Sequence, residues 1–125
     1  MLKVLIADDE EKICQLIIKL INWEEMGLKI AATASNGIEA LEQAKICKPE
    51  ILITDIRMPG IDGMELIRKV KEKLPDTEII IISGYRHFEY AQTAIRYGVR
   101  NYLLKPIKKE ELRDTLQKIA DIYRE

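Results

Sequence analysis

Five short apolar runs, each followed by a segment with helical spacing, constrain the fold of this chain more than any other feature. The runs are rich in β-branched residues, which pack well on a pleated sheet. Alternation of strands with helices is typical of a parallel α/β sheet, because each helix carries the chain back to begin the next parallel strand. We therefore predict five strand-helix units, with strands in KVLIA, KIAATA, EILITD, EIIIIS and NYLLK.

Two of these runs, residues 51–53 and 79–82, are apolar without alternation, as expected for strands that helices cover on both faces. We predict that they form the centre of the sheet. Glycine and proline residues separate the strands from the segments of helical pattern. The predicted helices span residues 10–21, 37–47, 64–74, 88–97 and 109–123.

Composition favours one globular domain with no charged partner surface. The chain has 125 residues, 47% of them hydrophobic, which is enough for a substantial core. Its net charge of -1 and the absence of a long run of one sign favour neither nucleic acid nor a membrane as partner. The sequence has no signal peptide and no stretch of transmembrane length, so we expect a cytoplasmic protein. Cys14 and Cys47 lack a Cys-x-x-Cys motif, and we expect reduced, packed thiols.

Polar side chains stand where four of the predicted strands end. Asp8 and Asp9 follow the first strand, Asp55 ends the third, Ser83 the fourth and Lys105 the fifth. In an open α/β sheet, ligands bind beyond the carboxyl ends of the strands. We therefore expect these five side chains to converge on one edge of the sheet.

Such a cluster suits phosphoryl transfer. Three carboxylates within about 5 Å repel one another by about 3 kcal/mol per pair at an effective dielectric constant near 20, which favours a bound cation. Hard oxygen ligands suit Mg²⁺. With Mg²⁺, the Lys105 ammonium and the Ser83 hydroxyl would surround the oxygens of a phosphoryl group, and an aspartate can be its covalent acceptor. We predict that Asp8 and Asp9 hold the metal that lets Asp55 receive a phosphoryl group.

Each of these residues also has a structural explanation. Asp8 and Asp9 could cap the first helix, and Asp55 could begin the turn DIRMPGIDG. Ser83 could belong to a turn, and Lys105 could close a strand before a proline that opens a helix. Taken singly, these explanations are at least as good as the functional ones. Taken together, they do not explain five polar residues at four strand ends of one sheet.

The motifs LIADDE, ILITDIRMPGIDG, IIISGY and NYLLKP occur in this order along the chain. With them the chain resembles, end to end, the receiver domain of two-component response regulators. The resemblance implies one receiver domain over residues 1–125 and a flavodoxin-like (βα)5 fold. That fold is a doubly wound, five-stranded parallel sheet with strand order 2-1-3-4-5.

The resemblance also assigns roles at the site. It implies that Asp55 is the phosphoacceptor and that Asp8 and Asp9 bind Mg²⁺. The backbone carbonyl of Arg57 would be a further metal ligand.

Three other positions match the family's pattern. Ser83 stands at the hydroxyl position, where many members have threonine, and Lys105 at the lysine position. Tyr102 stands at the position of the switch aromatic. Movement of Ser83 toward the phosphoryl group would let Tyr102 rotate and repack the face formed by the fourth helix, the fifth strand and the fifth helix. The resemblance also implies a cis bond between Lys105 and Pro106.

Partners follow from the same resemblance. A sensor histidine kinase would donate the phosphoryl group, and phosphorylation could drive homodimerisation. The domain would not be an enzyme beyond its own phosphorylation and dephosphorylation. INWEEMGLKI and residues 82–106 resemble the subset with arabinose-regulator-type helix-turn-helix outputs that control transcription. We expect no output domain in these 125 residues, so that DNA would be contacted only through an output domain absent from this chain.

The first predicted helix has an unusually wide apolar face, spread over roughly 200° at about 100° per residue. A stripe facing a core needs about half that width. The family docks its kinase on this helix, so we predict that Ile13 and Leu16 form an exposed docking edge. The alternative is deep burial of the helix, above all at Ile17 and Ile21.

Three further residues carry weaker expectations. Arg57 and Tyr85 lie two residues beyond Asp55 and Ser83, where family members tune hydrolysis, and their bulk suggests a slow reaction with water. Both could equally be plain surface residues. His87 is the one histidine, at the start of the fourth predicted helix, and we expect a surface or capping role instead of an internal phosphohistidine relay.

Two competing functions use a similar fold. A haloacid-dehalogenase-like phosphatase needs a general acid two residues beyond its nucleophile, but Arg57 stands there. A flavodoxin-like flavin binder needs a phosphate loop after the first strand, where Asp8, Asp9 and Glu10 would repel the phosphate. Multiple-turnover hydrolysis would favour the phosphatase, and stoichiometric self-labelling favours the receiver.

Overall fold

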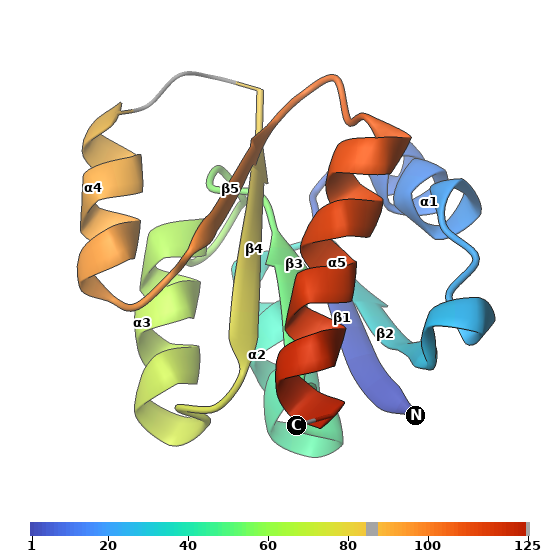
Figure 1. The fold of residues 1–125 in the computed structure, drawn as a ribbon. Coiled ribbons are helices and arrows are strands. Elements are labelled where there is room, and N and C mark those ends of the chain that lie inside the picture. Colours follow the sequence, from blue (N-terminus) through green and yellow to red (C-terminus); the bar gives the residue numbers. More distant parts are fainter. Residues whose placement is uncertain (85–87, 125) are drawn as a thin grey trace.

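The computed structural model describes residues 1–84 and 88–124, which form one parallel sheet between two layers of helices (Figure 1). The five strands are in the order β2-β1-β3-β4-β5, and all four neighbouring pairs are parallel. The strands are β1 (Leu2–Ala7), β2 (Leu28–Ala34), β3 (Ile51–Thr54), β4 (Glu78–Ser83) and β5 (Asn101–Leu104). The predicted fold and strand order are therefore confirmed.

The α-helices also agree with the prediction to within one residue at each end. They are α1 (Glu11–Leu20), α2 (Gly37–Cys47), α3 (Gly63–Lys73), α4 (Phe88–Arg96) and α5 (Lys109–Arg124). Glu10 and Ile21 have extended backbones, so α1 is one residue shorter at each end than predicted. A short 3-10 helix, η1 (Glu24–Met26), was not predicted because a single turn carries no periodic apolar pattern.

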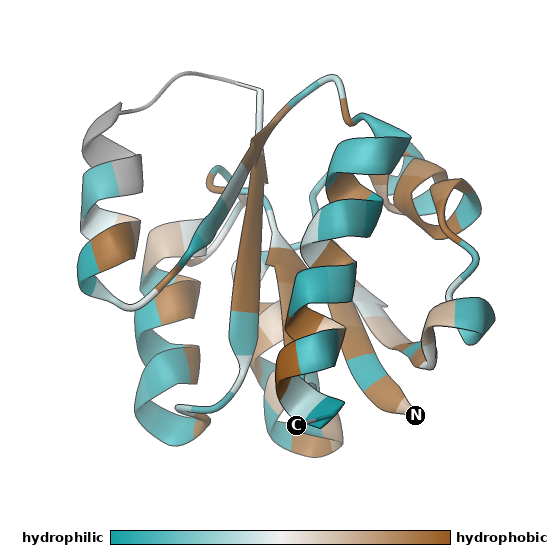
Figure 2. Ribbon diagram, in the orientation of Figure 1, coloured by the Kyte–Doolittle hydropathy of each residue, from teal (hydrophilic) through white to brown (hydrophobic). Residues whose placement is uncertain are grey.

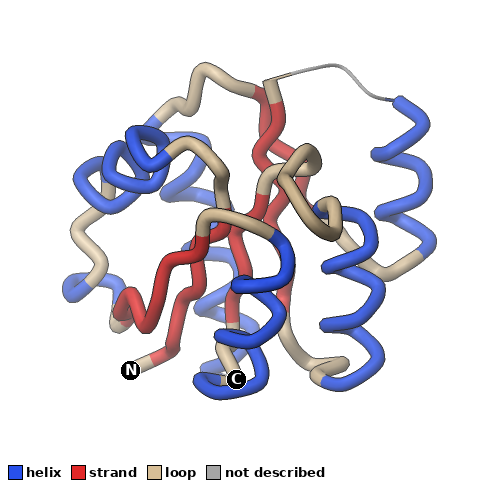
Figure 3. Tube along the Cα trace, turned by 180° about the vertical axis from the view of Figure 1, so that it is seen from behind, coloured by secondary structure: helices blue, strands red, loops and turns tan. Residues whose placement is uncertain are grey.

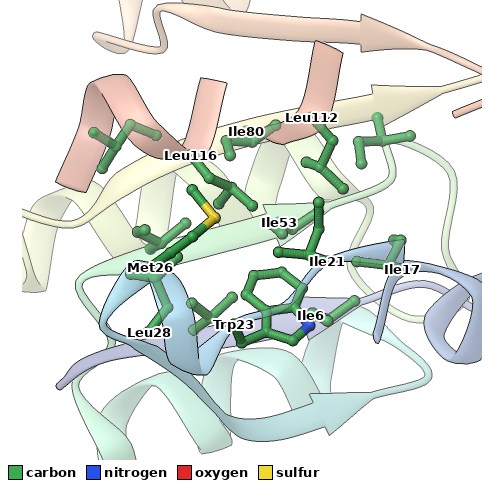
Figure 4. Close-up of a cluster of buried hydrophobic side chains, with 14 of the residues drawn as sticks. Ile6, Ile17, Ile21, Trp23, Met26, Leu28, Ile53, Ile80, Leu112 and Leu116 are labelled. Atoms are coloured by element: carbon green, nitrogen blue, oxygen red, sulfur yellow. The ribbon is translucent and has the colours of Figure 1, made fainter. Parts of the chain in front are cut away.

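One face of the sheet packs against α1 and α5. Its core contains alternate residues of the central strands, such as Ile53 and Ile80, together with Leu116 of α5 (Figure 4). Trp23 lies in the same cluster, and its indole N–H donates to the carbonyl oxygen of Ile18 at 3.0 Å. The segment between α1 and β2 is therefore part of the core.

The other face packs against α2, α3 and α4, of which α2 and α3 lie nearer the viewer in Figure 3. Leu52 and Ile81 point to this side, so both faces of β3 and β4 are buried, as the unbroken apolar runs predicted. The central strands in Figure 2 are hydrophobic over most of their length, whereas the helices show hydrophilic outer surfaces. No helix in the described part of the chain is both long enough and apolar enough to cross a lipid bilayer.

Both cysteines are free thiols, Cys14 buried and Cys47 partly exposed, which agrees with the prediction of reduced thiols. At the amino-terminal edge of the sheet, the end of α5 is tied to its surroundings. The Tyr123 hydroxyl donates to the backbone carbonyls of Glu50, at 3.2 Å, and of Asp76, and the Arg124 guanidinium donates to the Met26 carbonyl. The opposite edge, where the strands end, is left open for a site.

Candidate functional site

The register of β1 and β3 places two aspartates side by side. Ala7 pairs with Thr54 at the end of both strands, so the next residues, Asp8 and Asp55, leave the sheet together. The Asp55 N–H donates to the Ala7 carbonyl at 3.1 Å, and the Asp8 N–H donates to the Ala34 carbonyl of β2 at 3.0 Å. The aspartates are thus continuations of the sheet, and their backbones are held by its hydrogen bonds.

The ends of β4 and β5 add the other two polar groups. Ser83 pairs with Leu104, and the Lys105 N–H donates to the Ser83 carbonyl at 2.8 Å. Ser83 is buried at the end of β4. The bond between Lys105 and Pro106 is cis, as the resemblance implied.

The side chain of Lys105 joins the two aspartates. Its Nζ lies 2.9 Å from Oδ2 of Asp55 and 3.2 Å from Oδ2 of Asp8. The three side chains are 18%, 12% and 3% exposed respectively. An ammonium that is shared by one buried and one mostly buried carboxylate has little water to weaken its attraction, so this contact is stronger than a surface ion pair.

A candidate cation site lies within the same group. Asp8, Asp9 and Asp55 each offer a carboxylate oxygen, and these atoms lie within 4.8 Å of one another. Asp8 is buried whereas its neighbour Asp9 is exposed. Hard carboxylate oxygens open to water on one side fit Mg²⁺, which keeps several waters and takes one or two carboxylates from a protein.

Two backbone N–H groups orient the buried carboxylates. Oδ1 of Asp8 accepts from the Glu10 N–H at 2.9 Å, and Oδ1 of Asp55 accepts from the Ile56 N–H at 2.6 Å. In both aspartates the other oxygen, Oδ2, faces Lys105. The two oxygens of each carboxylate therefore have different partners, which fix the orientation of the carboxylate plane.

Burial shifts the acid-base properties of the site. It raises the pKa of the Asp8 carboxyl, against the opposing effects of the Glu10 N–H and the Lys105 ammonium, and the charge of Asp55 adds to the rise. For Lys105, burial by itself lowers the pKa, but the hydrogen bond and charge of Asp55, followed by those of Asp8, outweigh it and raise the pKa. Lys105 therefore stays protonated at neutral pH and can hold negative charge.

The remaining predicted residues are more scattered. Tyr102 is half-buried on β5 and packs against the cluster under α2, α3 and α4. Arg57 is exposed directly after the buried Ile56. Tyr85 and His87 lie outside the described residues.

Of the two residues predicted to form an exposed docking edge on α1, only Leu16 is exposed. Leu16 is 42% exposed, but Ile13 is half-buried and packs against the core that α1 shares with α5. Ile17 and Ile21 are buried, as the alternative interpretation held.

Sequence reasoning missed the residues that border the site without belonging to a strand end. Glu11 and Glu39 line a groove beside Asp8, between the starts of α1 and α2. Gly37 and Gly63, at the starts of α2 and α3, pack against the segment that follows Asp55. A glycine at the first position of a helix, where alanine is the better helix former, is the signal that could have drawn attention to both.

Comparison with known proteins agrees with the fold. Residues 4–117 match the family described as the response regulator receiver domain. The transcriptional regulatory protein YesN of Bacillus subtilis is 43% identical over 126 residues, which cover 100% of this chain and 34% of YesN. The chain thus spans about a third of the length of that relative.

Two solved structures are similar to this chain in both fold and sequence. The receiver domain of AraT, a response regulator from Geobacillus stearothermophilus, is 42% identical with a TM-score of 0.93, over 98% of this chain and 95% of that one. A two-component transcriptional regulator AraC from Clostridium phytofermentans is 36% identical with a TM-score of 0.89, over 97% and 94% of the two chains.

Proposed function

The chain belongs to the response regulator receiver domain family, and from this premise we propose that it receives a phosphoryl group on Asp55 from a sensor histidine kinase. The observation that carries the proposal is the contact of Lys105 with both Asp55 and Asp8, inside a cluster of three carboxylates. The proposal is supported by this arrangement, in which a carboxylate oxygen of Asp55, the Lys105 ammonium and the three carboxylates lie together where the strands end.

The proposed reaction is an in-line transfer. A carboxylate oxygen of Asp55 attacks the phosphorus of a phosphohistidine, and a P–O bond forms as the P–N bond breaks. The electron pair of the broken bond stays on the imidazole nitrogen, which takes up a proton. The Ile56 N–H holds the Asp55 carboxylate in place, and the Lys105 ammonium can then bind an oxygen of the transferred group.

Asp8, Asp9, Asp55 and the backbone carbonyl of Arg57 would hold Mg²⁺. Bound Mg²⁺ would supply charge neutralisation for the phosphoryl oxygens. The donor set supports this, because Asp8 and Asp55 already have one oxygen each fixed by a backbone N–H. The domain would promote only its own phosphorylation and dephosphorylation, and it would not turn over a separate substrate.

We propose that Ser83 and Tyr102 carry the signal away from the site. Phosphorylation adds about -1.5 to -2 charges and three acceptor oxygens, which a hydroxyl at Ser83 can approach from the neighbouring strand end. Ser83 and Tyr102 lie on adjacent strands, with Ile81 of β4 paired to Tyr102. A shift at the end of β4 would then bias how Tyr102 packs, and with it the surface of α4, β5 and α5.

The output that this surface controls is proposed to be transcription, since the similar protein YesN is a transcriptional regulatory protein. Contact with DNA would run through an output domain, and phosphorylation would favour a homodimer. The kinase would dock on α1, where Leu16 offers an exposed apolar side chain and Ile13 borders the core. A cytoplasmic location is part of the same proposal.

Intact mass spectrometry tests the central step. The protein is incubated with acetyl phosphate with and without Mg²⁺, alongside Asp55→Asn and the control Asp114→Asn, which alters an exposed carboxylate on α5. We expect one phosphoryl adduct that requires Mg²⁺, is absent from Asp55→Asn and persists in Asp114→Asn. An adduct retained in Asp55→Asn would show that Asp55 is not the acceptor.

A further inference from the structure

Two helices begin with glycine next to the segment that follows Asp55, residues 56–62. Gly37 is the first residue of α2 and Gly63 the first of α3. Neither is among the residues with positive φ, so a left-handed backbone does not explain them. Helix propensity favours alanine over glycine, which makes the choice of glycine unfavourable locally. The reason must lie in what surrounds the missing Cβ.

Gly63 packs directly on the backbone of the proposed phosphoacceptor. A Cβ at this position would overlap the carbonyl oxygen of Asp55 and would lie 2.7 Å from Cα of Ile56. The Gly63 N–H also donates to the Ile56 carbonyl at 2.6 Å. One end of the segment is thus clamped between β3 and α3.

Gly37 packs on the other end of the segment. A Cβ here would overlap the carbonyl oxygen of Ile61 and would lie 2.5 Å from Cγ1 of the same residue. The Gly37 N–H donates to the Pro59 carbonyl at 3.3 Å. The start of α2 therefore lies in direct backbone contact with residues 59–61.

The same contact is tight when viewed from the segment. Gly60 has a φ of +83°, and a Cβ on it would lie 3.2 and 3.3 Å from the side chain of Ile38, the second residue of α2. Ile56 and Met58 are buried in the core, whereas Pro59 and Gly60 are exposed. Pro59 and Gly60 can therefore move outward while Ile56 and Met58 stay in the core. The start of α2 is the surface on which Pro59 and Gly60 pack.

We propose that Gly37 is a positioning residue for the phosphoryl-transfer site. The absence of a side chain at Gly37 lets residues 59–61 rest on α2, and this contact holds the Arg57 carbonyl toward the cation that Asp8 and Asp55 bind. Pro59 is two residues from Arg57, so displacement at one is passed along the backbone to the other. The inference rests on the proposed function, since it concerns the metal site of that reaction.

The test is the substitution Gly37→Ala, read by Mg²⁺ affinity. The Mg²⁺ dissociation constant is measured from the Mg²⁺-dependent rise in melting temperature, and labelling by acetyl phosphate is followed at low and at saturating Mg²⁺. Loss of a group that supports metal ligands costs about 10- to 100-fold in affinity. We therefore expect the Mg²⁺ dissociation constant to rise roughly tenfold. Labelling should be slow at low Mg²⁺ and should recover at saturating Mg²⁺.

A merely structural role would lower the melting temperature without altering Mg²⁺ affinity. Glu42→Ala is the matched control, because Glu42 is an exposed residue of the same helix and should leave both quantities unchanged. Ile38→Ala removes the exposed side chain of α2 that lies against Gly60, and it should weaken Mg²⁺ binding in the same direction. If Gly37→Ala does not fold, the Mg²⁺ affinity of Ile38→Ala tests the inference.

Unchanged Mg²⁺ affinity in Gly37→Ala, or in Ile38→Ala where Gly37→Ala does not fold, would overturn the inference. The proposed function would survive that result as long as the unmodified protein is labelled on Asp55. Failure of the unmodified protein to bind Mg²⁺ or to be labelled would overturn both.

Discussion

Asp8 and Asp9 are neighbours in the chain with the same side chain, but the fold gives them opposite environments. Asp8 is 3% exposed and contacts Lys105, whereas Asp9 faces solvent. Burial raises the pKa of Asp8. A carboxyl group with a raised folded-state pKa favours folding below its unfolded pKa and loses that contribution as the pH rises. Ionisation of Asp8 with rising pH therefore lowers the stability of the metal-free protein.

The substitution Asp8→Asn should therefore stabilise the protein when Mg²⁺ is removed by a chelator. The amide keeps an oxygen for the Glu10 N–H, while Lys105 keeps Asp55 as its partner. We expect a melting temperature higher by roughly 4 °C, which corresponds to about 1 kcal/mol for a domain of this size. Thermal unfolding at pH 7 measures the change.

Asp9→Asn serves as the control for this prediction, since it removes the same charge from an exposed position. Its effect on the melting temperature should be clearly smaller. A loss of stability in Asp8→Asn would mean that the attraction of Lys105 outweighs the cost of burying the Asp8 charge.

Among the helices, α1 shows how one element can serve both the core and a surface. Ile17 is 1% exposed and packs under the sheet, whereas its neighbour Leu16 is 42% exposed. Residues one position apart in a helix point about 100° away from each other. Adjacent leucine and isoleucine residues therefore face different surroundings, and substitutions at the two should have different consequences.

Leu16→Ala should leave stability nearly unchanged and slow phosphoryl transfer from the cognate histidine kinase. Labelling by acetyl phosphate should stay at the rate of the unmodified protein, because that small donor needs no docking surface. Transfer from the kinase at an unaltered rate would argue against docking at Leu16.

The matched variant Ile17→Ala should lose about 2–5 kcal/mol of stability through the cavity it creates. Urea unfolding of both variants separates the contribution of the core from that of the surface.

The end of α5 is attached through Tyr123 to the amino-terminal edge of the sheet, opposite the carboxylate cluster. Burial, followed by the charges of Glu78, Glu50 and Asp76, raises the pKa of this tyrosine to about 12. Since the folded pKa lies above the unfolded value, the stabilising effect of the phenol is complete below pH 10 and is lost as the pH rises through about 12.

Tyr123→Phe should cost about 1 kcal/mol at pH 7, the typical net value of a hydrogen bond. Alkaline titration of the phenolate absorbance should lose its last component in this variant. Titration curves of the two proteins that coincide above pH 11 would contradict the assigned environment of Tyr123.

For the molecule as a whole, Mg²⁺ binding at the proposed carboxylate site would raise the stability of the fold. A ligand that binds the folded state alone raises the free energy of unfolding by RT ln(1 + [L]/Kd), or about 2.7 kcal/mol at a concentration 100 times Kd. We expect Mg²⁺ to raise the melting temperature in a concentration-dependent way. The rise should be much reduced in Asp8→Asn and Asp55→Asn, and differential scanning calorimetry over a Mg²⁺ series measures it. A rise of equal size in all three proteins would place the ion elsewhere.

Local pattern was sufficient to predict the α-helices and strands of the described residues and to single out the polar residues at the strand ends. The unbroken apolar runs at residues 51–53 and 79–82 identified the buried central strands, since a strand covered on both faces has apolar side chains on both and no alternation with polar ones. Asp55, Ser83 and Lys105 were found because parallel strands end at one edge, a rule that holds whatever the packing of the helices.

Tertiary structure alone decided how these groups meet. The shared contact of Lys105 with Asp8 and Asp55 joins residues 97 and 50 positions apart, and no local pattern encodes such a distance. The partial burial of Ile13, the different exposure of Asp8 and Asp9, and the contact of Gly37 with Ile61 likewise depend on which elements pack together. Periodicity describes one element at a time, whereas exposure and close approach are properties of pairs of elements, so they arise only when the chain has folded.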